Sequence, residues 1–540
     1  MEEKRVRYQW HCRILSYLFW QFNHPHDFYF SISSNVNVFL PLRPKLYVTS
    51  PAFGSIFKPE RFIMNANLSS YADKVNLGFS VFDHIFYSDS SLAFGNILSA
   101  DRIRAMFADS DALFGYGENN FWNTGVTLWS FICQVLQDGK QSSCNAAVTN
   151  ATRYMLENGM IPPGPDSGEY CRARNKLNIK VLRQIVCDTA GRISQQTPEK
   201  WLWHGKDVKL VDGFAFTMPD TPENQLEFPQ SKSQKPGIGF PIARACAVLS
   251  LSNACIHNIS IGPYAGKDTG ETALLRKVIN CFKPGDVMLA DRYFCSFFML
   301  AILKSRGIDV CMRLHQRRQP DMSKVKWLGE NDYIDTWHKP QRAKWISQQL
   351  YDSLPDKMAI RVVSFKARSK NQSEDLNVVT TLVDSKEYPA KEIGILYGYR
   401  WHAELDIFSI KQTLNLNHLR CKSPDMVRRE LWVTLLAYNL VRLVCAQAAF
   451  VHNKLARQMS FTISCNALIS QWLWGYQEGL RQELHRCALR QIAHNEVGDR
   501  PGRIEPRVIK RRPKRYTLMT KPRHEYKRAK AKHEYRQQET

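Results

Sequence analysis

The sequence predicts an α/β fold in which a mixed β-sheet is flanked by helices, and three observations predict it. Between residues 205 and 310, strand-like apolar runs come first and then alternate with helical ones, a pattern typical of mixed sheets covered by helices. The stretches on either side, 94–195 and 390–490, have apolar residues at helical spacing. Short β-type runs separated by polar loops fill 312–388, which predicts a β-rich insertion.

The N-terminal part contains an irregular segment followed by a helical one. Residues 1–63 mix aromatics, prolines and scattered charges without a sustained period, and we hypothesise that the working protein starts at Met64. Beyond residue 94, Ser99 and Asp101 have the character of an N-cap and a first-turn acid, so a helix is expected to follow. Four basic residues near the end of this helical part indicate either a solvated helix face or a DNA-binding bundle, and both remain open. They are Arg172, Arg174, Lys176 and Arg183.

The central sheet is expected from the order of its strands and helices. The first three runs have no helical pattern between them and are predicted to be antiparallel neighbours. A helix, a buried strand, a second helix and a further strand are predicted to follow. In chain order these segments are 208–217, 243–252, 254–262, 270–282, 286–293, 295–307 and 309–314.

Composition narrows the function classes. The formal net charge of +24 suits a polyanionic partner such as a nucleic acid. The last 41 residues carry 15 lysines or arginines against 4 acids, which predicts a disordered basic tail. The fourteen cysteines include no CxxC pair, so we expect reduced thiols in a cytosol, and not a zinc ribbon or a disulfide scaffold. The lack of a GxxxxGK[ST] loop disfavours an ATP-driven motor.

No membrane span is expected from the sequence. Its apolar runs fall short of the roughly 18 residues that a membrane helix needs, and the longest candidate lies near Phe294–Leu303. The apolar run 430–450 contains Arg442 and has amphipathic spacing, which predicts a packed helix.

Asp212 is the first candidate functional carboxylate. In a strand over 208–217 it shares one face with four apolar residues, where an unpaired charge is costly unless a metal ion compensates it. The alternative is an aspartate at a strand end, hydrogen-bonded to a turn, because Gly213 follows it. Asp220 is a rival, but nearby prolines predict a turn or cap residue. The four apolar residues are Val208, Leu210, Phe214 and Phe216.

Asp291 is the second candidate carboxylate. It closes the apolar strand Val287–Ala290, and the carboxyl ends of central strands are where α/β sheets present ligand-binding groups. Arg292 follows at once, so a structural aspartate–arginine pair is an equally good explanation.

Glu404 is the third, and its helix has the sharpest pattern. At about 100° per residue, Tyr397, Arg400, Glu404 and Lys411 lie together on one arc of a helix, beside an apolar stripe that should face the core. A solvated face with an i,i+4 arginine–glutamate pair is the plain alternative. The arrangement also suits a carboxylate metal ligand flanked by phosphate donors. The apolar stripe comprises Leu396, Tyr399, Ala403, Ile407, Ile410 and Leu414.

Together the three carboxylates indicate a metal-dependent enzyme acting on DNA. Two Mg²⁺ ions that move phosphodiester bonds need carboxylate oxygens from several fixed elements, and the basic composition suits the polyanionic substrate.

The spacing Tyr397-x2-Arg400-x3-Glu404-x6-Lys411 is a YREK signature, and the chain resembles bacterial insertion-sequence DDE transposases of the insertion-sequence-four family. The runs VDGFAFTMPDTPENQLEFPQ and LADRYF are similar to that family's segments around its first two catalytic aspartates. The resemblance extends from about residue 94 to the basic C-terminus, whereas residues 1–63 match nothing in the family pattern.

The resemblance implies an RNase H-like catalytic domain interrupted by a β-rich insertion. It implies that Asp212, Asp291 and Glu404 hold two divalent ions, Mg²⁺ or Mn²⁺, and that the enzyme cleaves its element's ends and joins the 3′ ends to target DNA. The implied partners are terminal inverted repeats, target DNA and a second protomer in a synaptic complex, with no membrane and no nucleotide cofactor, in the cytoplasm at the nucleoid. Backbone contacts are implied for Tyr397, Arg400 and Lys411, with Arg292 as a helper, and one of Trp327, Trp337 and Trp345 supports a flipped base.

Pattern and resemblance together predict six parts. They are an N-terminal extension, 1–63; a helical candidate DNA-binding domain, 64–200; the first part of the catalytic core, 201–311; the β-rich insertion, 312–388; the second part of the core with C-terminal helices, 389–490; and the basic tail, 491–540.

Two other functions remain open. A host nuclease of the same fold would share the three carboxylates and would cut without joining. A non-catalytic DNA-binding protein derived from a transposase is the other, although such a chain has no physical need for three converging acids.

Overall fold

The structure is a computed structural model, and it describes residues 75–76, 78–82, 93–117, 120–157, 162–369, 372–474, 481–497 and 519–528. The chain divides into two units, 1–66 and 67–540, and the described residues all belong to the second. The predicted extension at 1–63, the hypothetical start at Met64 and most of the predicted disordered tail lie outside the described residues.

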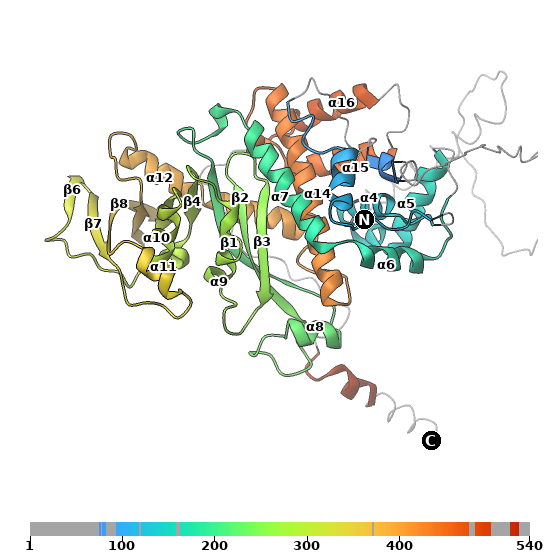
Figure 1. Cartoon of the computed structure of the whole chain (residues 1–540), viewed down its shortest axis with the longest axis horizontal. Helices are drawn as coiled ribbons and strands as arrows, with labels where there is room; N and C mark the ends of the chain where they lie inside the picture. The colour runs from blue at the N-terminus through green and yellow to red at the C-terminus, as the bar shows by residue number, and fades with distance from the viewer. Residues whose placement is uncertain are drawn as a thin grey trace, which may run out of the picture. The chain divides into compact units, whose positions relative to one another are not determined.

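A single sheet runs through the described part of the chain (Figure 1). It has nine strands in the order β3-β2-β1-β4-β5-β9-β8-β7-β6. The strands are β1 (Val208–Thr217), β2 (Ile242–Ser250), β3 (Ile256–Pro263), β4 (Val287–Ala290), β5 (Asp309–Arg313), β6 (Lys326–Gly329), β7 (Asp332–His338), β8 (Lys357–Ser369) and β9 (Gln372–Thr380).

The first five strands form the predicted RNase H-like arrangement. β1, β2 and β3 are antiparallel neighbours, as the sequence predicted, and β1, β4 and β5 are parallel. Parallel neighbours need crossover connections, and the helical segments that follow β3 and β4 supply them. They are shorter than predicted, and the helices are α9 (Glu271–Arg276) and α10 (Phe297–Ser305).

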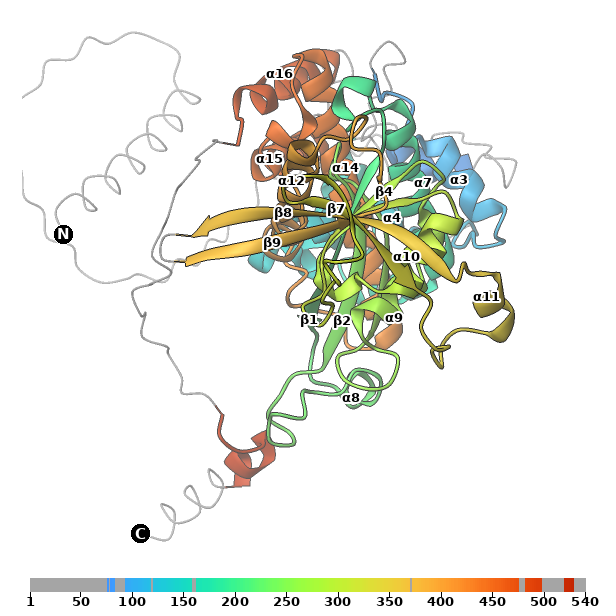
Figure 2. The same cartoon turned by 90° about the vertical axis from the view of Figure 1, so that its left-hand side faces the viewer.

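The β-rich insertion extends this sheet and does not form a separate one. β9 pairs with β5 in antiparallel register, and β8, β7 and β6 continue the sheet as an antiparallel series. Figure 2 shows β8 and β9 side by side as a long hairpin that reaches away from the helices. One short helix, α11 (Gln348–Ser353), lies between β7 and β8 in the chain.

Both faces of the core strands are buried, which explains their nearly continuous apolar runs. Val211 and Ala290 face a cluster that includes residues of α9 and α10. Leu210 and Leu289 face a second cluster that includes the helices of the N- and C-terminal parts. Asn439 of α14 (Pro424–Val451) joins that layer to β3, because its side chain bonds both the N–H and the C=O of Ile256, at 2.8 and 3.0 Å.

The N-terminal helices form the predicted helical part and pack around α14. Ser99 is an N-cap as predicted, because its side chain accepts from the N–H of Arg102. Of the four basic residues near the end of this part, Arg174 is buried and contacts Gln134, whereas the other three are exposed. The helices are α3 (Ala100–Ala108), α4 (Thr124–Leu136), α5 (Cys144–Glu157), α6 (Ser167–Lys176) and α7 (Ile179–Gln196).

The longest helix, α14, runs through the middle of this layer (Figure 1). Its 28 residues are long and apolar enough to cross a membrane by length and composition, so the expectation that no apolar stretch approaches that length was wrong. Of its most apolar window, 94% is buried inside the protein, and the helix also carries Glu430 and Arg442 as buried charges. The other helices of this part are α8 (Pro222–Glu227), α12 (Ala390–Gly398), α13 (Trp401–Phe408), α15 (Phe461–Trp474) and α16 (Arg481–His494).

Candidate active site

Asp212 and Asp291 come from neighbouring parallel strands at the same level. Val211 of β1 pairs with Ala290 of β4, and each is followed directly by one of the two aspartates. Neighbouring strands lie about 4.8 Å apart, so the register brings the two carboxyl-bearing residues side by side. Asp291 also caps the short 3-10 helix Arg292–Phe294, because its Oδ1 accepts from the N–H of Tyr293 at 2.8 Å.

β1 does not end at Asp212. The strand continues to Thr217, so the alternative of a strand-end aspartate bonded to a turn at Gly213 was wrong. The alternation prediction is confirmed, since Leu210, Phe214 and Phe216 are buried on one face. The rival Asp220 lies outside this strand, where its carboxylate accepts from the side chain of Gln225 at 2.8 Å, as suits a turn residue.

The pKa of Asp212 depends on burial and on the charges of the residues around it. Burial raises its pKa to about 6, the Gly213 N–H and the Arg400 guanidinium oppose this, and the charges of Asp291 and Glu404 add to it. Carboxylates act on one another in this way only when they are close, which makes the set a candidate functional site.

Glu404 lies on a helix that is less regular than predicted. Hydrogen bonds that span three residues, and not the four of an α-helix, separate α12 from α13, including Arg400 N–H to Tyr397 O at 3.0 Å. The chain then widens into a π-helical turn at Ser409–Thr413, which contains Lys411. Such turns are frequent at functional sites. The predicted apolar stripe is buried except for Tyr399, which lies exposed at the tight turn.

The residues of the YREK spacing differ from one another in burial and in contacts. Arg400 donates from Nη2 to Oε1 of Glu404 at 2.8 Å, and both side chains are half-buried. The Nζ of Lys411 lies 5.9 Å from the ring of Phe214, on the face of β1 that also bears Asp212. Tyr397 is buried, and burial raises the pKa of its hydroxyl to about 12, against the opposing charge of Arg400.

Arg292 does not form the structural pair that was the alternative explanation for Asp291. Its Nη1 donates to Oε1 of Gln316 at 3.1 Å. Among the residues that the structure describes, no ion pair joins Arg292 to Asp291.

The donor chemistry fits hard divalent cations, which prefer carboxylate oxygens. As they stand, no three His, Cys, Asp or Glu side chains within the described ranges are gathered tightly enough to enclose an ion. Arg400 donates to Glu404, so its guanidinium compensates the charge of that carboxylate.

A fourth carboxylate, Glu271 on α9, was missed by the sequence analysis. A Cβ at Gly213 would overlap the Glu271 carboxyl, so glycine is needed beside Asp212 for this approach. Burial raises the pKa of Glu271, Arg244 lowers it, and Asp291 raises it further. The glycine inside the strand was the available signal, because such a residue often marks a close approach.

A cavity of about 910 Å³ lies between the N-terminal helices and the core. Its walls include Arg174, Leu414 and Glu430, and none of the three carboxylates lines it. The carboxylates are therefore presented outside this cavity.

Comparison with known proteins finds a family match in the middle of the chain. A family model described as a transposase DDE domain matches residues 203–440, a range that contains the three carboxylates. The match identifies this segment, which includes the RNase H-like sheet, as a transposase DDE domain.

The similarity to the insertion-sequence-four family is confirmed by its relatives. The transposase InsG for insertion sequence element IS4 of Escherichia coli (strain K12) is 27% identical over 358 residues, 65% of this chain and 78% of that protein. The transposase for insertion sequence element IS231F of Bacillus thuringiensis subsp. israelensis is 21% identical over 316 residues, 52% of this chain and 63% of that protein. Among solved structures, the piggyBac transposase synaptic complex with hairpin DNA has a TM-score of 0.37 and 10% identity, over 79% of this chain and 86% of that chain.

Proposed function

We propose that this transposase cleaves DNA at the ends of its mobile element and joins the freed 3′ ends to target DNA by phosphoryl transfer. The observation that supports the proposal is the parallel register that sets Asp212 beside Asp291, together with the charges of Asp291 and Glu404 that act on the buried Asp212. Two divalent cations, Mg²⁺ or Mn²⁺, bound there would supply Lewis-acid chemistry at the attacking and leaving oxygens.

The protein's own residues position the reacting phosphate. The carboxylates of Asp212, Asp291 and Glu404 would hold the ions from a strand, the end of a strand and a helix, which are rigid elements. Arg400 lies against Glu404, so a DNA phosphate that takes over its guanidinium would free the glutamate for metal binding. Lys411 and Arg292 are half-buried near the same strands and would contact the flanking phosphates. Tyr397 is buried and would act from the wall of the site.

Of the three tryptophans, Trp327 of β6 suits a flipped base best. It is 53% exposed, whereas Trp337 is 1% exposed and stacked against Arg318 at 3.7 Å. Trp345 is 38% exposed, but Arg276 lies 4.2 Å above its ring. The Trp327 ring contacts Tyr333, with ring centroids 5.4 Å apart, and an exposed ring of this kind can stack on a base.

Each predicted part of the chain has its own role in this proposal. The helical part at 64–200, with Arg172, Lys176 and Arg183 exposed, binds the terminal inverted repeats, and the basic tail at 491–540 adds non-specific phosphate contacts. The core at 201–311 and 389–490 carries the chemistry, and the insertion at 312–388 carries Trp327. Processing two element ends together calls for two protomers, so we propose a homodimer in the synaptic complex, acting on nucleoid DNA.

The test is incubation of the protein with DNA that carries its own flanking sequences and Mg²⁺, with nicked and joined strands resolved separately. Nicking followed by joining supports the proposal. Nicking without joining would indicate a nuclease, and Mg²⁺-independent binding without cleavage would indicate a DNA-binding protein.

A further inference from the structure

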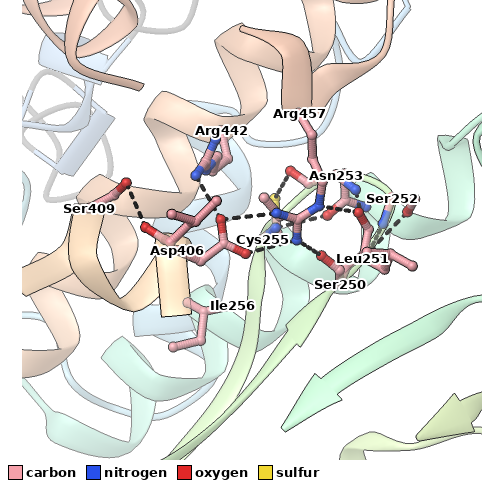
Figure 3. Close-up of polar contacts among 12 residues, drawn as sticks. Ser250, Leu251, Ser252, Asn253, Cys255, Ile256, Asp406, Ser409, Arg442 and Arg457 are labelled. Atoms are coloured by element: carbon pink, nitrogen blue, oxygen red, sulfur yellow. Dashed lines mark hydrogen bonds and ion pairs between the residues drawn. The ribbon is translucent and has the colours of Figure 1, made fainter. Parts of the chain in front are cut away.

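Asp406 lies two residues after Glu404 on α13 and is buried, with 1% of its surface exposed. Its carboxylate accepts from two arginines (Figure 3). Nη2 of Arg442 on α14 donates to Oδ1 at 2.9 Å. Nη1 and Nη2 of Arg457 donate to Oδ1 and Oδ2 at 3.1 and 2.8 Å.

The same cluster reaches the sheet that carries Asp212. Arg457 donates from Nη2 to the carbonyl of Ser250 at 2.7 Å, and from Nε to the carbonyl of Leu251 (Figure 3). Ser250 is the last residue of β2, and β2 pairs with β1 along its length, with Ala247 opposite Asp212. A buried chain of contacts thus joins the helix of Glu404 to the strand of Asp212.

Stability alone is a weak reason for such a cluster. Desolvating one carboxylate and two guanidiniums is costly, and buried ion pairs often add no net stability over apolar residues of similar volume. The cluster does supply a fixed geometry. α13 has only eight residues, with a tight turn before it and a π-helical turn after it, so its regular part offers few anchors of its own.

We propose that Asp406 is a positioning residue, which through Arg457 and Arg442 holds Glu404 at the distance from Asp212 and Asp291 at which the three can share divalent cations. The inference rests on the proposed metal-binding role of Glu404. Partners that orient metal ligands are worth about 10- to 100-fold in metal affinity or activity when they are removed.

The test compares Asp406→Asn with Asp332→Asn in the full-length protein. Asp332 is a matched control, because it is also buried and accepts from Arg361 at 2.9 and 2.7 Å, but within β7 and β8 of the insertion. Mn²⁺ binding to the DNA-free protein is measured by electron paramagnetic resonance, alongside Tm, end-DNA binding and the Mg²⁺ dependence of cleavage.

We expect both variants to lose Tm and to keep end-DNA binding. Only Asp406→Asn should bind Mn²⁺ about 10- to 100-fold more weakly and need correspondingly more Mg²⁺ for cleavage. Equal Mn²⁺ affinity and equal Mg²⁺ dependence in the two variants would overturn the inference. If Asp406→Asn does not fold, Arg457→Gln replaces it, since it leaves the Arg442 pair intact and removes the link to Ser250 and Leu251. Wild-type Mn²⁺ affinity in Arg457→Gln would also overturn it.

A Glu404→Ala variant separates this inference from the proposed function. If Glu404→Ala keeps both Mn²⁺ binding and cleavage, the assignment of Glu404 as a ligand fails and the positioning role fails with it. If Glu404→Ala loses both while Asp406→Asn keeps them, only the positioning role is wrong.

Discussion

Val211 of β1 pairs with Ala290 of β4 in parallel register, and an aspartate follows each of them. Two carboxylates are thereby fixed side by side by backbone pairing, before any ligand is bound. The third, Glu404, comes from a helix that packs against β1. Burial raises the pKa of Asp212 to about 6, and the charges of Asp291 and Glu404 add to this rise.

Replacing any one of the three carboxylates by its amide should abolish cleavage and leave end-DNA binding largely intact. Asp212→Asn, Asp291→Asn and Glu404→Gln keep side-chain volume and remove a charge that the cations need, so cleavage should fall by at least about 100-fold. The measurement is single-turnover nicking with Mg²⁺. Asp220→Asn, at the rival turn position, is the control and should cut normally. Near wild-type cutting by one of the three variants would reject that residue.

The stability of the metal-free protein should fall as pH rises through the titration of Asp212. Its folded pKa of about 6 exceeds the value of about 3.9 for an unfolded chain, so its contribution is full below pH 4 and is lost as pH rises through about 6. At about 1.4 kcal/mol per unit, the loss is about 3 kcal/mol.

The matching measurement is urea unfolding in EDTA at several pH values, for the wild type and for Asp212→Asn. The variant lacks this titration, so the difference in unfolding free energy between the two should grow in the variant's favour between about pH 4 and pH 7. Parallel curves would show that Asp212 titrates normally. Added Mg²⁺ should reverse the order, because the cation binds the ionised carboxylate.

Gly213→Ala should displace the Glu271 carboxyl, because the new Cβ would overlap it. That carboxyl is the far end of a flexible side chain and can swing aside, so the loss of stability should stay below the roughly 1–3 kcal/mol of an overpacked core. Nicking should fall more clearly than stability, because Glu271 lies within reach of the charge of Asp291. Thermal unfolding and nicking report the two effects. Gly191→Ala is the control, since it lies in α7 with open space around it and should be neutral or slightly stabilising. A Gly213→Ala protein that nicks DNA like wild type would show that the position of the Glu271 carboxyl does not matter to the site.

Trp327→Ala should weaken the step after DNA binding in which a flipped base at the element end stacks on this ring. Stacking of a base on an aromatic ring is worth about 1–3 kcal/mol, which corresponds to about 5- to 150-fold in the affected step. A 2-aminopurine placed at the cleavage end reports unstacking by its fluorescence. Trp345→Ala is the comparison, because Arg276 already covers its ring. Equal fluorescence changes in wild type and Trp327→Ala would exclude this tryptophan.

The elements of the core could be predicted because their signals are local. The alternation around Asp212 specifies a strand face, and the position of Asp291 after Val287–Ala290 places it at a strand end. Helical periodicity alone predicts that the residues from Tyr397 to Lys411 lie on one arc of a helix. Its irregular turns were missed, since they depend on backbone hydrogen bonds that side-chain periodicity does not record.

The remaining features depend on contacts between distant segments. Arg457, which holds Asp406, lies 51 residues further along the chain, so no spacing rule connects them. The pairing of β9 with β5, which makes the insertion part of one sheet, is equally remote from any local pattern. Glu271 lies against β1 at Gly213, and although the glycine signals a close approach, only the tertiary structure shows that its partner comes from α9.

The most direct test of the shared metal site is a crystal structure of the protein with its end DNA and Mn²⁺, with the ions located by anomalous scattering. Two Mn²⁺ ions should lie between Asp212, Asp291 and Glu404, with Arg400 turned from the glutamate toward a phosphate. Ions bound elsewhere, or three carboxylates that do not converge on them, would contradict a shared metal site.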